Sequence, residues 1–193
     1  MGSGASGVRE WIVACVFCLG FWQLAQGTDN PARAWLAQER MLRAWDRARH
    51  GSADPAPWPW SDTWPVARLS ARHGSVELIV LAGATGRTLA FGPGHLSTSS
   101  LPGQPGNTVI VGHGETYFSF LRDIEPGDPI ILETARGQRH LYEVVGMDVV
   151  DSRRGSLILD TETPMLSLVT RYPFEAYRAN ASMRYVVTAK MVF

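Results

Sequence analysis

Cysteine is almost absent from this sequence. The chain has 193 residues, and its only cysteines, Cys15 and Cys18, lie within one N-terminal apolar run. A CxxC pair can form a redox centre or half of a metal site, but a metal site needs further ligands and no second pair follows. We therefore interpret both cysteines as side chains of a membrane segment. The apolar content of 45% allows a sizeable core without disulfides.

A net charge is also missing. Lys and Arg number 18, Asp and Glu number 18, and the formal net charge is +0. Domains that bind nucleic acid are normally basic, so nucleic acid is not an expected partner. The sequence has no paired catalytic carboxylates, no glycine-rich phosphate loop and no metal-ligand spacing. It therefore implies no cofactor and no metal.

Residues 11–25 (WIVACVFCLGFWQLA) form the one uncharged apolar run. The run is short against the roughly 20 residues that cross a bilayer as a helix, although Trp11 and Trp22 could mark the two interfaces. A cleaved signal peptide is the alternative, because residues 25–27 form a weak small-x-small cleavage site. We favour an uncleaved anchor. Both interpretations place the remainder outside the cytoplasm.

Three regions follow from the pattern of the chain. Residues 1–29 are the anchor or signal peptide. Residues 30–65 combine a juxtamembrane helix over 30–49, with Asn30 as N-cap, and a linker over 50–65 in which prolines exclude helix and central strand. The three tryptophans of this linker, at positions 58, 60 and 64, are expected to pack on the domain that follows. That domain comprises residues 66–193.

Short apolar runs separated by Gly, Pro and Asn fill residues 66–193. The spacing predicts a mostly β fold, a closed or nearly closed barrel rich in antiparallel pairs. One helical turn is expected within it, at 117–124. The predicted strands are 66–69, 76–82, 88–91, 107–111, 129–133, 139–150, 156–159, 165–170 and 184–192.

Polar residues that could carry chemistry stand at three strand ends. His113 follows the apolar run TVIV, Arg171 ends the run LSLVT, and Arg184 opens the last predicted strand. Two of them have an ordinary interpretation that needs no chemistry. His113 could be a structural histidine, and Arg184 could form a surface ion pair. The cation at the tip of the buried strand, Arg171, is the least expected of the three.

Several motifs, in order, resemble the sortases, which are membrane-anchored cysteine transpeptidases, and most closely the Gram-negative class GN, or marine proteobacterial type. They are PWPWSDTWPVARL (57–69), LAFGPGHL (89–96), GHGETYF (112–118), LSLVTRYPF (166–174) and RYVV (184–187). The resemblance implies an eight-stranded β-barrel with short helices, preceded by a membrane helix and a juxtamembrane helix. It also implies an inner-membrane, single-pass protein whose barrel lies in the periplasm and whose substrate is a protein or peptide with a sorting signal.

By this resemblance His113 takes the position of the catalytic histidine and Arg184 that of the catalytic arginine. Arg171 falls where the family carries its nucleophilic cysteine, and a guanidinium keeps its proton and offers no lone pair to attack a carbonyl carbon. The neighbouring residues Thr170, Tyr172 and Glu115 are expected to contact substrate. Transpeptidation is therefore expected to be impaired in the chain as written.

Two further features bear on that expectation. Similar sequences usually read Gly-His-Arg-Asp where this chain has Gly112-His113-Gly114-Glu115, which hints that a cation lost at 114 has been gained at 171. The alternative is that Gly114 only relaxes a loop. Ser167 shares the face of Arg171 by alternation, but four strand residues separate them by about 13 Å, too far for a substitute nucleophile.

Three hypotheses remain open. The protein could bind sorting signals or acidic peptides without cleaving them, since two arginines in a cleft suit a carboxylate or phosphate. It could be an ordinary sortase that lost its cysteine by substitution, because one base change converts a Cys codon to an Arg codon. It could also be a structural envelope protein that uses the barrel as a spacer.

Overall fold

The computed structural model describes residues 31–52, 55–58, 61–174 and 182–192. The apolar run 11–25, the proposed cap Asn30 and Trp60 lie outside the described residues. No helix within the described part of the chain is both long and apolar enough to span a membrane. Contacts divide the chain into two compact units, Met1–Glu39 and Arg40–Phe193.

Helix α2 spans Pro31–Arg49 and crosses the boundary between the two units, so the predicted helix over 30–49 is confirmed. Its second half belongs to the larger unit, where Met41, Ala44 and Trp45 are buried. The Arg47 guanidinium donates a hydrogen bond to the carbonyl of Ala56 over 2.9 Å. The helix end is thus tied to the linker within this unit.

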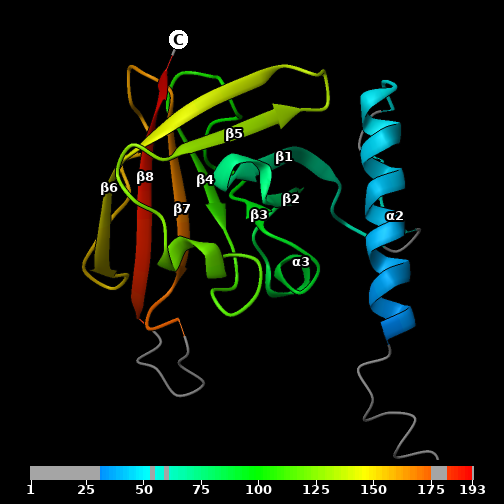
Figure 1. Cartoon of the computed structure of the whole chain (residues 1–193), viewed down its shortest axis with the longest axis horizontal. Coiled ribbons are helices and arrows are strands. Elements are labelled where there is room, and N and C mark those ends of the chain that lie inside the picture. Colours follow the sequence, from blue (N-terminus) through cyan, green and yellow to red (C-terminus); the bar gives the residue numbers. More distant parts are fainter. Residues whose placement is uncertain (1–30, 53–54, 59–60, 175–181, 193) are drawn as a thin grey trace, which may run out of the picture. The chain divides into compact units, whose positions relative to one another are not determined.

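Eight strands close into a barrel in the order β1-β2-β3-β4-β7-β8-β6-β5, as expected (Figure 1). Two helical turns, α3 (Gly86–Leu89) and η2 (Ser119–Arg122), and one short turn, η1 (Arg72–Gly74), connect them. The strands are β1 (Pro65–Ala71), β2 (Val76–Ala82), β3 (Gly94–His95), β4 (Asn107–Val111), β5 (Pro129–Thr134), β6 (Arg139–Asp151), β7 (Met165–Arg171) and β8 (Met183–Val192).

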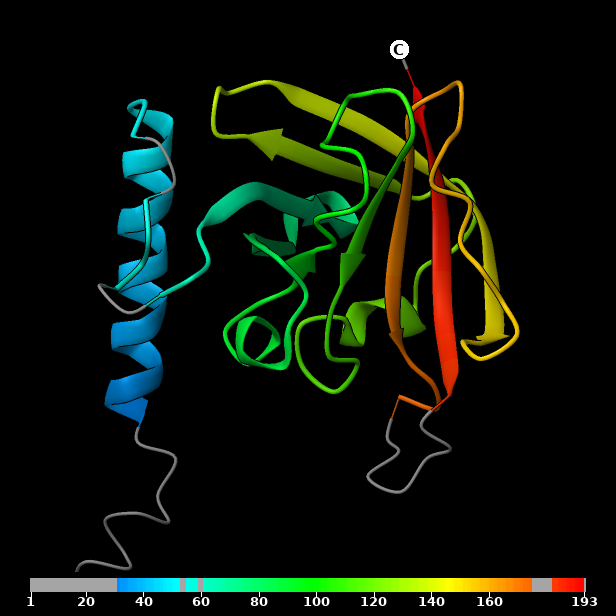
Figure 2. The same ribbon diagram turned by 180° about the vertical axis from the view of Figure 1, so that it is seen from behind.

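Strand β7 lies between a parallel neighbour, β4, and an antiparallel neighbour, β8, and the three run side by side in both views (Figures 1 and 2). Strand β1 alternates strictly between buried and partly exposed residues, so it buries one face only. In β7 the five residues 166–170 are all buried. Strand β7 is thus covered on both faces, and such strands are mostly apolar along their whole length, as the sequence LSLVT is.

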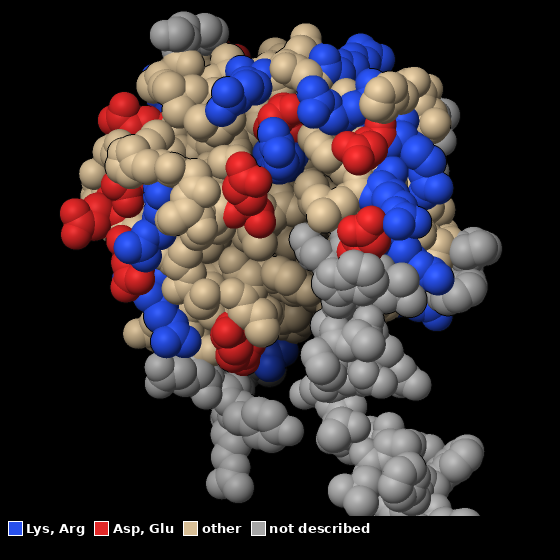
Figure 3. Space-filling model, turned by 45° about the vertical axis from the view of Figure 1, so that its right-hand side comes forward, with Lys and Arg blue, Asp and Glu red and all other residues tan. Residues whose placement is uncertain are grey.

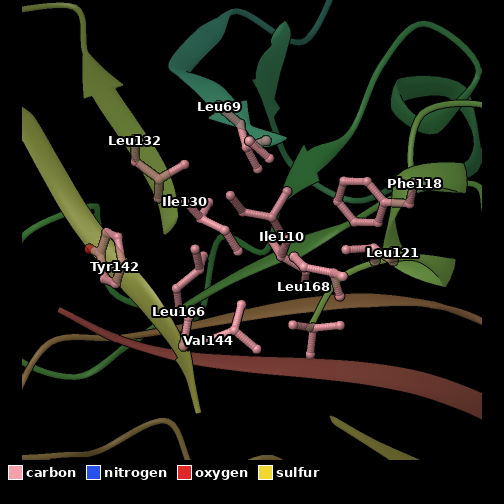
Figure 4. Close-up of a cluster of buried hydrophobic side chains, with 14 of the residues drawn as sticks. Leu69, Ile110, Phe118, Leu121, Ile130, Leu132, Tyr142, Val144, Leu166 and Leu168 are labelled. Carbon is pink, nitrogen blue, oxygen red and sulfur yellow. The ribbon is translucent and has the colours of Figure 1, made fainter. Parts of the chain in front are cut away.

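The main core fills the barrel (Figure 4). Side chains from most strands meet there with Phe118 and Leu121 from the connection after β4. The largest buried members include Leu69, Ile110, Ile130, Leu132, Tyr142, Leu166 and Leu168. Burial of a Leu or Ile side chain stabilises the fold by about 1.5–3 kcal/mol.

Two predicted strands are wrong. Residues 88–91 overlap α3, because the Thr85 hydroxyl accepts a hydrogen bond from the Thr88 amide and caps a helical turn. Residues 156–159 form no strand, although their leucines are apolar, because they cover the outer face of β7 as an extended segment. The two-residue strand β3 was not predicted, and it is too short to carry a periodic signal.

The linker packs on the barrel as expected where it is described. Trp58 is buried and meets Phe91 edge-on, with ring centroids 4.7 Å apart. Thr63 donates its hydroxyl hydrogen to the carbonyl of Ala82 over 2.6 Å. Packing on the barrel therefore explains Trp58 in this proline-rich segment.

Candidate active site

The ends of β4 and β7 lie together because the two strands are parallel and in register. Val111 is the register partner of Val169, and the Gly112 amide donates to the Val169 carbonyl over 3.1 Å. His113 follows directly. Strand β8 runs the other way and starts at the same end, where Arg184 is the register partner of Arg171. The structure thus brings the three predicted positions to one end of the barrel.

Alternation along β7 separates two faces. Leu166 and Leu168 point into the main core, whereas Ser167 and Val169 line a cavity on the outer face. Because side chains on one face of a strand recur every two residues, Arg171 lies on the same outer face as Ser167 and Val169. Arg184 lines the same cavity from β8. Two arginines therefore stand opposite each other at the end of the outer face.

This outer cavity, called the groove below, has a volume of about 690 Å³. Its walls are β7, β8, the second half of β6 and the segment 155–161. Most of its lining is apolar: Leu96, Val150, Leu157, Leu159, Val169 and Val186. Asp148 is the single carboxylate among its described lining residues. The volume and apolar character are those of ligand pockets.

Asn107 fixes the outer wall of the groove. Its side-chain amide donates to the carbonyl of Ile158 and to the hydroxyl of Ser167, each over 2.9 Å. Its backbone amide donates to the carbonyl of Leu159 over 2.8 Å. The segment that covers β7 is thus attached to the first residue of β4 by one buried side chain.

The turn that carries His113 is tightly packed. The Phe118 amide donates to the His113 carbonyl over 2.9 Å and closes the turn. Thr170 donates its hydroxyl hydrogen to the carbonyl of Gly112 over 2.8 Å. A Cβ on Gly114 would lie 2.9 Å from the Phe174 ring and 3.0 Å from the Thr170 hydroxyl. The turn is therefore held directly against the end of β7.

Aromatic rings surround the same end of β7. Tyr172 stacks on Tyr185 with ring centroids 6.4 Å apart, and Phe174 meets Tyr185 at 5.2 Å. The guanidinium carbon of Arg122 lies 5.2 Å from the centre of the Phe174 ring. Burial raises the pKa of the Tyr185 phenol, and nearby Tyr172 raises it further.

Among the described residues, charges of both signs stand at this end. Asp151 accepts hydrogen bonds from the Arg153 side chain and backbone, which lower the pKa of its carboxyl to about 2. The side chain of Arg171 makes no hydrogen bond or ion pair with any described residue. The Arg184 guanidinium donates a hydrogen bond to the Met183 carbonyl over 2.9 Å.

Other parts of the surface are mixed in charge. Figure 3 shows Lys and Arg interspersed with Asp and Glu over one face of the molecule. Within the described ranges, no group of three or more His, Cys, Asp or Glu residues is arranged to hold a metal ion.

A family model, the sortase domain, matches residues 69–192, which is more than half of the chain. The chain belongs to the sortase family. It is 35% identical over 119 residues to sortase D of Bacillus subtilis (strain 168), a match that covers 61% of this chain and 59% of that relative.

Two solved sortases have the same fold. Sortase A from Corynebacterium diphtheriae is 26% identical, with a TM-score of 0.61, and the match covers 99% of this chain and 96% of that one. Sortase C-1 from Actinomyces oris is 27% identical, with a TM-score of 0.59, and the match covers 80% of this chain and 99% of that one.

Within this member of the sortase family, the residues predicted to contact substrate occupy different environments. Thr170 is 1% exposed and its hydroxyl bonds to the backbone of Gly112, so it positions the His113 turn. Tyr172 is 37% exposed beside the arginine pair, and Glu115 is exposed on the turn. His113 is exposed at the strand end.

Sequence reasoning missed Asn107 and Phe174. Asn107 precedes an apolar strand, where a turn residue is ordinary, and nothing local indicates that it holds a segment 51 residues further on. Phe174 lies within the quoted motif RYPF, but its contact with Gly114 depends on the pairing of β4 with β7.

Proposed function

We propose that this sortase-family protein binds a protein segment in the groove and does not carry out transpeptidation as its sequence stands. One observation carries the proposal: Arg171 ends β7 opposite Arg184, beside the turn that bears His113. The family resemblance assigns the nucleophilic cysteine to that position. A protein substrate is in keeping with the family.

The proposal follows from the chemistry of the side chains. A thiolate can attack a backbone carbonyl and form an acyl-enzyme, with a histidine to protonate the leaving amine and an arginine to stabilise the oxyanion. The imidazole of His113 is suited to protonating the leaving amine, and the guanidinium of Arg184 is suited to stabilising the oxyanion. A guanidinium has a pKa above about 12 and cannot supply the attacking atom.

The nearest hydroxyl groups on β7 do not replace the thiol. The Thr170 hydroxyl faces inward and donates to the Gly112 carbonyl. The Ser167 hydroxyl accepts a hydrogen bond from Asn107 and lies four strand residues, or about 13 Å, from the end of β7. Neither hydroxyl therefore occupies the position from which a thiol would attack a carbonyl carbon held between His113 and Arg184.

The test uses purified full-length protein with a panel of sorting-signal peptides and hydroxylamine, which captures an acyl-enzyme. We expect no cleavage and no hydroxamate above the buffer control. Loss of a nucleophile costs several orders of magnitude in rate, so the assay has ample range. Robust turnover by the unaltered chain would show that the nucleophile is not missing.

The variant Arg171→Cys tests whether the site lacks only the nucleophilic sulfur or is altered at other positions as well. If the site is otherwise intact, the variant forms a trappable thioester, and the double variant Arg171→Cys with His113→Ala does not. A folded Arg171→Cys protein that stays inactive would indicate a site altered beyond one residue. Absence of peptide binding to the unaltered chain would instead favour the structural spacer.

We also propose a location for the protein. The uncharged run 11–25 and the resemblance to class GN support a single-pass anchor in the inner membrane of a Gram-negative cell, with the barrel in the periplasm. Fractionation should recover the full chain with inner membranes, and a chain that lacks residues 1–29 should be soluble. Recovery of a shortened chain in the soluble periplasm would support the cleaved signal peptide instead.

A further inference from the structure

We propose that the outer faces of β6 and β8 form a contact between two copies of this chain, related by a two-fold axis that runs parallel to these strands. The contact consists of six side chains, called the β6–β8 strip below: Leu141, Glu143, Val145, Thr188, Lys190 and Val192. The proposal goes beyond the binding function of the groove, because only Thr188 belongs to both surfaces.

The pairing of the two strands places the strip on one face. Strands β6 and β8 are antiparallel neighbours and run side by side in both views (Figures 1 and 2). Leu141 is the register partner of Val192, and Glu143 is the register partner of Lys190. Such partners share a face, with their Cβ atoms about 4.5–5.5 Å apart. Tyr142, which lies between the two β6 residues, belongs to the core, so the strip faces outward.

The strip exposes three apolar side chains. Leu141 is 41% exposed, Val145 is 54% exposed and Val192 is 37% exposed. The register of β6 against β8 shifts between Val144 and Gly146, which makes Val145 the extra residue of a β-bulge. Val144 is buried, so the bulge turns Val145 to the solvent side. Apolar side chains gathered on one exposed face and bordered by charges are typical of a protein–protein contact.

The order of the side chains selects the orientation of the contact. The strip has three rows across the two strands, with the charged row in the middle: Leu141 with Val192, Glu143 with Lys190, and Val145 beside Thr188. A two-fold axis parallel to the strands lays β6 of one copy over β8 of the other. Glu143 then faces Lys190 of the second copy, and each row faces its own equivalent. An axis across the strands would instead bring two glutamates together and two lysines together.

This self-complementarity identifies a second copy as the partner. A two-fold contact joins the same patch on both subunits, so the patch must match itself. In the proposed orientation Glu143 and Lys190 each gain a second opposite charge, and Leu141 faces Val192 of the other copy. An acidic or basic partner would repel one of the two charges. A wholly apolar partner would leave both charges without hydrogen bonds, which is costly.

The size of the strip indicates how tightly the copies associate. Standard interfaces bury about 800 Å² on each partner and involve roughly 20–30 residues a side, whereas the strip consists of six side chains. We therefore expect a reversible dimer with a dissociation constant in the micromolar range.

The experiment is sedimentation equilibrium of the purified full-length chain in a density-matched non-ionic detergent, between about 5 and 200 µM protein. The unaltered chain should show a monomer–dimer equilibrium. Glu143→Lys and Lys190→Glu should each raise the dissociation constant at least about tenfold, because like charges then face each other across the axis. An equimolar mixture of the two variants should dimerise again, because the two lysines of one variant face the two glutamates of the other.

Further variants separate the contact from general effects of charge and folding. Glu125→Lys makes the same change of charge at an exposed turn residue outside the strip and should leave the dissociation constant unchanged. The double variant Glu143→Lys with Lys190→Glu exchanges the two charges within one chain and should dimerise like the unaltered protein. Urea unfolding of each variant checks that it is folded.

Three results would overturn the proposal. A monomer at every concentration would leave the strip to a partner other than a second copy. Equal association of the unaltered chain and both single variants would place the contact elsewhere on the chain. A mixture of the two single variants that stays as monomeric as each alone would show that the charges do not face each other. Peptide binding and cleavage are measured separately, so none of these results changes the proposed function.

Discussion

A single glycine sets how closely the His113 turn approaches β7. Gly114 does not have the left-handed φ that favours glycine, so its backbone would accept another residue. The constraint is space, because a Cβ would press on Phe174 and Thr170. A larger side chain at this position would therefore require a different packing of Phe174.

We predict that Gly114→Ala destabilises the fold by about 1–3 kcal/mol, the usual cost of forcing an extra carbon into a packed site. Denaturant unfolding measures the change. Gly86→Ala is the matched control, because a Cβ there meets nothing within 4 Å. Equal stability of Gly114→Ala and Gly86→Ala would show that Phe174 moves aside freely.

The segment between β6 and β7 is the element that makes the groove. Residues 155–161 have no regular structure, yet they form one wall and bury part of the outer face of β7. Their attachment depends on Asn107, whose backbone and side chain bond to Leu159 and Ile158. One polar side chain at the start of β4 thus determines where the wall stands.

We predict that Asn107→Leu frees this wall without unfolding the barrel. The Ile158 carbonyl and Ser167 hydroxyl lose their donor, which costs about 1–3 kcal/mol. Hydrogen exchange should quicken at the backbone amide of position 107, which donates to the Leu159 carbonyl, and stay slow in β8. The control Gln104→Leu changes an exposed side chain. Unchanged exchange of the amide at position 107 in Asn107→Leu would contradict this role.

Among the described tyrosines, Tyr142 is completely buried in the barrel. Tyr142 is 0% exposed, and its hydroxyl oxygen accepts a hydrogen bond from the Gly103 amide over 3.0 Å. Burial raises the pKa of this phenol, and burial also raises the pKa of Tyr117 and Tyr185. An unfolded tyrosine ionises near pH 10, so the unfolded chain releases these protons first.

We therefore predict that stability is constant around neutral pH and declines as the pH rises above about 10, because the folded barrel keeps phenols protonated that the unfolded chain ionises. Urea unfolding at a series of pH values measures this. Tyr142→Phe should lose about 1 kcal/mol at pH 7 with its hydrogen bond and then decline less steeply above pH 10. A parallel decline in both proteins would assign the effect to other groups.

Much of the architecture is predictable from residue types and spacing. Pro31 and the polar and apolar residues that follow it indicate the helix that ends at Arg49, and short apolar runs between turn residues indicate the barrel. These features depend on neighbours in the chain. The chemistry of Arg171 is also predictable from the sequence, because a guanidinium is not a nucleophile in any fold.

The tertiary structure decided the features that depend on residues far apart in the sequence. The pairing of β4 with β7 buries Thr170 against Gly112, and Asn107 holds a segment 51 residues away. Apolar runs at 88–91 and 156–159 look like strands locally but lack a partner in the barrel. Local sequence determines which conformation a segment favours, and hydrogen bonding and burial between distant segments determine where it lies.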